Sequence, residues 1–113
     1  MIQKILGQST PASTTDTTIY TVPTSCQAQC SVLIANRTTS NDKFRIAIVP
    51  QGSTLDNKHY IAYDVSITPG QFVQVSEIYI NTGDFIVVRS ENGNVSFSVT
   101  GMEMNRSRMR VLT

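Results

Sequence analysis

The sequence predicts an all-β protein: an antiparallel β-sandwich of about eight short strands with no significant helix. Apolar residues alternate with polar ones over short runs, which is the pattern of half-buried antiparallel strands. Gly, Pro, Asn and Asp separate these runs at a spacing of roughly ten residues. Thr and Ser, which favour strands and turns, account for 14 and 12 of the 113 residues. This spacing favours a jelly-roll topology, with an Ig-like sandwich as the alternative.

The alternation and the turn residues together define the expected strands. They lie near residues 2–6, 18–22, 27–36, 43–49, 59–67, 71–80, 84–90 and 94–103. In the fourth strand, Phe44, Ile46 and Ile48 share one face. Side chains two positions apart point to the same side of a strand, so we expect this face to line the core.

Three stretches make more specific predictions. The run 59–67 is expected to turn four residues inward, namely Ile61, Tyr63, Val65 and Ile67. In the run 71–80 the apolar positions change face, which either a bulge near Ser76-Glu77 or a strand that changes sheets would reconcile. Asn92-Gly93 is expected to form a tight type I′ hairpin between the last two strands.

The two ends of the chain contain features that a compact domain does not require. We expect an N-terminal arm over residues 1–17, a sandwich domain over 18–103 and a basic C-terminal tail over 104–113. The apolar residues of the arm are expected to bury against a neighbouring subunit; they are Ile2, Ile5 and Leu6. Three tail residues are expected to meet acidic groups on a neighbour: Arg106, Arg108 and Arg110.

Composition limits the partners. The formal net charge is +1 and only 15% of residues are charged, which favours neither nucleic acid nor an acidic membrane surface. The first 21 residues lack the apolar core of a signal peptide, and no apolar run reaches the length of a membrane span. We therefore expect a protein made in a cytoplasm.

Reactive chemistry is sparse, and we expect no enzyme, no cofactor and no metal site. Cys26 and Cys30 would lie about 13 Å apart along one strand, too far for a disulfide, and are expected to be small buried residues. The single histidine, His59, falls on the apolar side of a strand end and is expected to be structural or part of an interface. A Ser-His-Asp arrangement is formally available, but no nucleophile motif accompanies it.

A glycan site remains an alternative, because jelly rolls include lectins. Sugars stack on exposed aromatic rings, and the candidates are Tyr20, Tyr60 and Tyr79. Tyr60 is the preferred candidate because it falls on the polar face of its strand.

Seven segments of the chain form a recognisable pattern. In order they are Leu6–Ala12, Thr17–Pro23, Asn36–Arg37, Phe44–Ala47, Asn57–Asp64, Gly83–Asp84 and Val95–Phe97. In these segments the chain resembles small virion structural proteins of tailed phages. This resemblance implies a β-sandwich subunit that binds other virion proteins. The chain departs from the family pattern in its two cysteines and in the added residues 104–113.

From this resemblance we expect a non-enzymatic structural protein. It would decorate or cement the capsid, or serve as an accessory tail protein, and reside in the virion after synthesis in the host cytoplasm. Homo-oligomers are expected, with a trimer favoured, because repeated weak contacts in a closed ring add up to firm attachment. The alternative is a receptor- or glycan-binding module at the tail tip or fibre.

Overall fold

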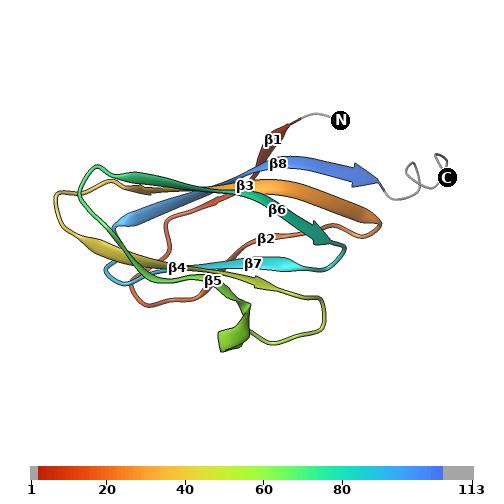
Figure 1. The fold of residues 1–113 in the computed structure, drawn as a ribbon, viewed down its shortest axis with the longest axis horizontal. Helices are drawn as coiled ribbons and strands as arrows, with labels where there is room; N and C mark the ends of the chain where they lie inside the picture. The colour runs from red at the N-terminus through yellow and green to blue at the C-terminus, as the bar shows by residue number, and fades with distance from the viewer. Residues whose placement is uncertain (1–2, 106–113) are drawn as a thin grey trace.

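The computed structural model describes residues 3–105, which form two four-stranded antiparallel sheets packed face to face. Figure 1 shows the two sheets as an upper and a lower layer. The strands are β1 (Lys4–Ser9), β2 (Thr17–Thr21), β3 (Cys26–Asn36), β4 (Asp42–Val49), β5 (Tyr60–Ile67), β6 (Phe72–Asn81), β7 (Phe85–Ser90) and β8 (Val95–Asn105). Apart from the short 3-10 helix η1 (Asn57–His59), residues 3–105 contain no helix. The predicted all-β sandwich of eight strands is confirmed.

The strand order is that of a jelly roll. One sheet runs β1-β8-β3-β6 and the other β2-β7-β4-β5. Strand β1 pairs with β8, β2 with β7, β3 with β6 and β4 with β5, all antiparallel. The first four strands thus pair with the last four as one long hairpin, with the β4–β5 turn at its tip. This hairpin is folded over so that each sheet contains two strands from each half of the chain. This order favours the jelly roll over the Ig-like alternative.

The core lies between the two sheets and follows the alternation of the sequence. Phe44 and Ile46 are buried and Ile48 packs beside them, as expected. The rings of Phe44 and Phe97 meet edge to face across the sandwich, with centroids 6.3 Å apart. A second, smaller cluster lies outside the core and contains Ala47, Val49 and Val87, covered by Leu55, Tyr60 and Phe85.

The predicted bulge in the sixth strand is present. The register between β3 and β6 shifts between Cys30 and Val32, opposite Ser76 and Glu77. Glu77 has a φ of 62°, a left-handed conformation that lets the strand take up one extra residue. Four apolar residues therefore all face the core despite their uneven spacing: Val73, Val75, Ile78 and Ile80.

The prediction for the inner face of β5 is wrong for Ile61 and Tyr63. Val65 lies on the core side of the strand, opposite the core residue Phe44, but stays partly exposed at the edge of the sheet. Ile67 is buried, but Ile61 and Tyr63 are exposed. The β4–β5 register shifts twice, and Asp64 adopts a φ of 52° at one of these irregularities. Two bulges change which side chains point inward, and β5 is an edge strand with no neighbour to cover it.

The expected Asn92-Gly93 hairpin is also wrong. Strand β7 belongs to one sheet and β8 to the other, so residues 91–94 cross between layers instead of joining paired strands. The buried Asp42 carboxylate organises this crossing by accepting hydrogen bonds from the backbone N–H groups of Asn92 (2.9 Å) and Asn94 (3.0 Å). The residues that favour a tight hairpin therefore form a connection between sheets, because the distant Asp42 side chain binds their backbone.

The expected boundaries at both ends need correction. Residues 4–9 are not part of a free arm but form β1, the edge strand paired with β8. Gly7 lies so close to β2 that a Cβ atom there would come within 2.2 Å of the carbonyl oxygen of Ile19. Strand β8 continues to Asn105, two residues past the expected end of the sandwich at residue 103.

Candidate interaction surface

The outer face of the β1-β8-β3-β6 sheet is almost free of charge, and we call it the neutral face. Its central side chains are Gln27, Gln29, Ser31, Leu33 and Ala35 on β3, opposite Met104, Met102, Thr100, Ser98 and Ser96 on β8. Among the described residues of this sheet, Lys4, Glu77 and Glu103 carry charge. Lys4 and Glu103 pair with inward-facing positions, so Glu77 at the bulge is the one charge on this face.

Large apolar side chains are exposed on the neutral face. Phe72 is 78% exposed and Tyr79 is 67% exposed on β6, and Ile5 is 61% exposed on β1. Leu33 lies between them on β3 and is 39% exposed. Exposed apolar side chains on a surface without charges are typical of protein contacts.

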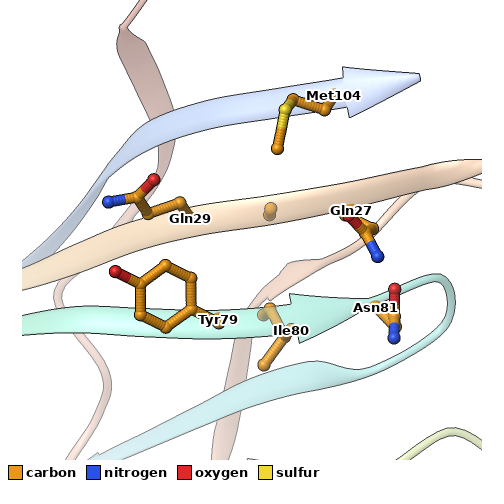
Figure 2. A pocket seen from close by; sticks show the side chains of 7 residues that line it. Gln27, Gln29, Tyr79, Ile80, Asn81 and Met104 are labelled. Carbon is orange, nitrogen blue, oxygen red and sulfur yellow. The ribbon is translucent and has the colours of Figure 1, made fainter. Parts of the chain in front are cut away.

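A shallow hollow of about 170 Å³ lies at one end of this face. Figure 2 shows Gln27 and Gln29 on β3, flanked by Met104 on one side and by Tyr79 and Asn81 on the other. Amide groups, a phenol and a thioether line it, and no acidic or basic side chain is among them. The hollow is therefore suited to an uncharged polar or apolar group from a partner.

The outer face of the second sheet is different and carries opposed charges. Arg45 on β4 lies directly across from Arg89 on β7. The Arg45 guanidinium donates two hydrogen bonds to the Asp64 carboxylate, at 2.7 and 3.2 Å, and Arg89 lies 3.6 Å from Asp16. The hydrogen bond from Arg45 holds the pKa of Asp64 below its usual value, and the same contact raises the pKa of Arg45. Each arginine thus has its own acidic partner.

Tyr60, the preferred glycan candidate, lies on this charged face. It is half-buried against the small cluster of Ala47 and Val49. Its ring meets that of Tyr63 at a centroid distance of 4.9 Å, and the Arg45 guanidinium lies 4.0 Å from the Tyr63 centroid. Tyr63 is 53% exposed, so it presents more ring surface to solvent than a half-buried Tyr60. The sequence missed Tyr63 because it was expected to face the core.

The other two tyrosine candidates lie in different environments. Tyr79 lies on the neutral face, whereas Tyr20 is buried and its hydroxyl donates a 2.6 Å hydrogen bond to Glu103. Burial and the Glu103 carboxylate raise the pKa of Tyr20. The same hydrogen bond, with help from Lys4 at 3.2 Å, holds the pKa of Glu103 below its usual value. Tyr20 therefore links the two sheets and is removed as a sugar contact.

The structure separates the apolar residues expected to contact a neighbour. Leu6 packs against the protein's own core, whereas Ile5 points outward on the neutral face. Ile2, Arg106, Arg108 and Arg110 lie outside the described residues. Of the six residues predicted for subunit contacts, Ile5 is the one that the structure describes as exposed on a candidate surface.

The histidine and the two cysteines lie in surroundings that suit structural roles. His59 is buried, and its Nδ1 accepts a hydrogen bond of 3.0 Å from the backbone N–H of Asp56, which caps η1. Cys26 and Cys30 are free thiols, and burial raises the pKa of Cys30 to about 11. A thiol with such a pKa is protonated near neutral pH and is a poor nucleophile.

The described residues contain neither a candidate metal site nor a helix that could span a membrane. Residues 3–105 contain no group of three or more His, Cys, Asp or Glu side chains placed to hold a metal ion. Within the same range no helix is long and apolar enough to cross a membrane.

Comparison with known proteins identifies no relative. No family model matches the chain, and searches of curated proteins and of solved structures found no significant match. The neutral face therefore has to be interpreted from its own residues.

Proposed function

We propose that this protein is a non-enzymatic structural subunit of a phage particle that attaches to neighbouring virion proteins through its neutral face. The observation that carries the proposal is a sheet face with one charge, Glu77, and with Ile5, Leu33, Phe72 and Tyr79 exposed. Such a face binds by burying surface and requires no reactive group.

Two further observations support the proposal. Seven segments of the chain, among them Leu6–Ala12 and Thr17–Pro23, resemble small tailed-phage virion proteins. The jelly roll is also a fold used by viral capsid proteins, which is an argument by analogy of fold. The role would be decoration or cementing of the capsid, or accessory attachment to the tail. Either role places the protein in the virion after synthesis in the host cytoplasm.

Gln29 offers a direct test of attachment through this face. It lies on the neutral face, on the inner strand β3, and lines the hollow of Figure 2. Gln29→Lys has a similar length but introduces a charge, which a neutral contact would have to desolvate. The matched control is Thr18→Lys on β2, an exposed position that faces outward on the other sheet.

The assay is incorporation into particles by phage that carry each substitution. We expect Gln29→Lys to reduce the copies per purified particle at least about tenfold, since a cost of about 1.4 kcal/mol changes binding tenfold. Thr18→Lys should leave the copy number unchanged, and electron microscopy of wild-type particles should locate the subunit. Normal incorporation of folded Gln29→Lys protein would refute attachment through this face.

A second candidate function is glycan binding on the charged face. The observation that favours it is the pair of Tyr60 and Tyr63 rings beside the Arg45–Asp64 ion pair, which combines aromatic surface with hydrogen-bonding groups. The test is binding of the isolated protein to a glycan array, compared with Tyr63→Ala. Binding that depends on Tyr63 would support a receptor-binding module, and its absence from all glycans tested would count against it.

A further inference from the structure

We propose that two copies of this chain associate through the side of the sandwich formed by β5 and β6. In this arrangement a two-fold axis pairs β6 of one copy antiparallel with β6 of the other, and brings the two β5 strands next to each other. The inference concerns contact between copies and does not depend on how the protein attaches to a particle.

The first observation is the distribution of exposed apolar side chains. Among the described residues, seven large apolar side chains are exposed, and five of them lie on β5 and β6. These five are Ile61, Tyr63, Val65, Phe72 and Tyr79. In addition, three core-facing residues of the two strands are only half-buried: Ala62, Val73 and Val75. The core is therefore incompletely covered along this side.

The second observation is that the two sides of the sandwich are closed differently. Strands β1 and β2 lie against each other, with Gly7 directly beside the Ile19 carbonyl. The opposite edges of the two sheets are β6 and β5, which therefore share the other side. Each pairs with a neighbour on one side alone within the described chain, so each has a free row of backbone N–H and C=O groups.

Strand β6 lacks the features that usually protect a free edge. It is ten residues long and contains no Pro or Lys, and Glu77 is its one charged residue. Natural edge strands are commonly short, or carry Lys, Pro or inward-pointing charges. A bulge is the one protective feature present, at Ser76-Glu77. This edge can accept another strand.

A second copy fits the pattern of faces along β6. With the two-fold axis between Val75 and Ser76, Phe72 of one copy lies opposite Tyr79 of the other, and both belong to the neutral face. In the same register Val73 lies opposite Ile78, and both face the core. Gln74 then lies opposite Glu77, so the two Glu77 carboxylates do not face each other. Aromatic and apolar cross-strand pairs of this kind stabilise antiparallel sheets.

A partner that binds the side formed by β5 and β6 must match it in shape and charge. It has to offer two strand edges about 10 Å apart, the spacing of packed sheets, and the same side of a second copy does so. The side carries little charge, since Asp64 is neutralised by Arg45 and Glu77 is alone on β6. Two such sides approach without appreciable repulsion.

This side also exposes apolar surface that a dimer can bury in part. From their exposures of 53%, 78% and 67%, Tyr63, Phe72 and Tyr79 together expose about 400 Å². This is half of the roughly 800 Å² that each partner contributes to a stable interface. Ile61, which is 47% exposed, and Val65, which is 39% exposed, add to this area. The sequence favoured a trimer, but pairing of like edges is an isologous contact and gives a two-fold dimer.

The test is the oligomeric state of the full chain, measured by sedimentation velocity over a range of concentrations. Wild-type protein should form a dimer, and Phe72→Lys and Tyr79→Lys should each raise its dissociation constant at least about thirtyfold, the effect of removing a hot-spot side chain. Both side chains are exposed, so the substitutions should leave the fold unchanged by circular dichroism. The matched control is Ile5→Lys, because Ile5 is similarly exposed on the edge strand of the opposite side.

Each outcome decides the proposal. A dimer that weakens with Phe72→Lys and Tyr79→Lys but not with Ile5→Lys supports it, and the dissociation constant should not depend on ionic strength because the contact is neutral. A monomer at all concentrations, a trimer, or a dimer indifferent to both β6 substitutions would overturn it. Gln29→Lys protein should dimerise normally, so failure of the dimer and failure of particle attachment are separable.

Discussion

Replacing Asp42 with asparagine is expected to lower the free energy of unfolding by about 2 kcal/mol. Asp42 is 2% exposed at the start of β4. Its carboxylate accepts hydrogen bonds from the Ser90 hydroxyl at 2.8 Å and from the backbone N–H of Lys43 at 2.7 Å. It also accepts the N–H groups of Asn92 and Asn94 described above, so one side chain joins β4, the end of β7 and the crossing to β8.

The magnitude follows from these four donors. In Asp42→Asn the amide oxygen still accepts from two backbone N–H groups, but the amide nitrogen replaces the oxygen that faces Ser90 and Asn94. The Ser90 hydroxyl can rotate, whereas the N–H of Asn94 then points at another donor. One unsatisfied buried donor costs about 1–3 kcal/mol. Asp42→Ala leaves all four donors without their acceptor and should cost about 4 kcal/mol after water enters part of the space.

Urea unfolding followed by circular dichroism and tyrosine fluorescence measures this loss, since the chain has no tryptophan. With a slope of about 1–3 kcal/mol per M, a loss of about 2 kcal/mol lowers the midpoint by roughly 1–2 M. Asp42→Ser serves as an intermediate variant that retains one acceptor. If Asp42→Asn and Asp42→Ala unfold at the wild-type midpoint, the carboxylate does not hold the crossing as argued.

The pH dependence provides a second readout. Burial alone would raise the pKa of Asp42, but the hydrogen bonds from Ser90 and the backbone outweigh it and hold the pKa below its usual value. A lowered folded-state pKa means that the unfolded chain binds the proton more tightly. The contribution of Asp42 is therefore complete above about pH 4, the unfolded value, and is lost as pH falls through the folded value. The difference between wild type and Asp42→Asn should shrink over that acidic range.

Two further predictions concern the closed side of the sandwich. Tyr20→Phe removes the hydroxyl that Glu103 accepts, and should cost about 1.5–3 kcal/mol at neutral pH. Because this hydrogen bond lowers the pKa of Glu103, the cost should diminish as pH falls below about 4, and urea unfolding at both pH values checks this. Gly7→Ala places a Cβ atom against the Ile19 carbonyl and should destabilise the fold by about 1–3 kcal/mol. If Gly7→Ala and wild-type protein have the same urea midpoint, β1 can shift freely.

Much of the local structure could be predicted from the sequence. For β2 to β8, the expected ends of each strand lie within about two residues of the observed ends. This agreement arises because side-chain alternation is a local property of the backbone. The bulge at Ser76-Glu77 was also predictable, since Val73 and Val75 change phase with Ile78 and Ile80. With that bulge, Phe72 and Tyr79 fall on the face opposite these four residues.

The errors occur where long-range partners decide the outcome. Ile61, Tyr63 and Val65 alternate like core residues, but β5 has one neighbour and two bulges, so they are exposed. Asn92-Gly93 has the residues of a tight hairpin, yet the turn joins two different sheets because Asp42, some fifty residues away, binds its backbone. Residue patterns do not specify which strand lies beside which.

The sequence by itself determined an all-β chain of eight strands with little reactive chemistry, because strand period, turn residues and the absence of motifs are all local. The tertiary structure alone decided which strands share a sheet. That choice gathers uncharged side chains from β1, β3, β6 and β8, separate in the sequence, onto one face. It also closes the sandwich at β1 and β2 and leaves β5 and β6 open, because sheet edges are defined by non-local pairing.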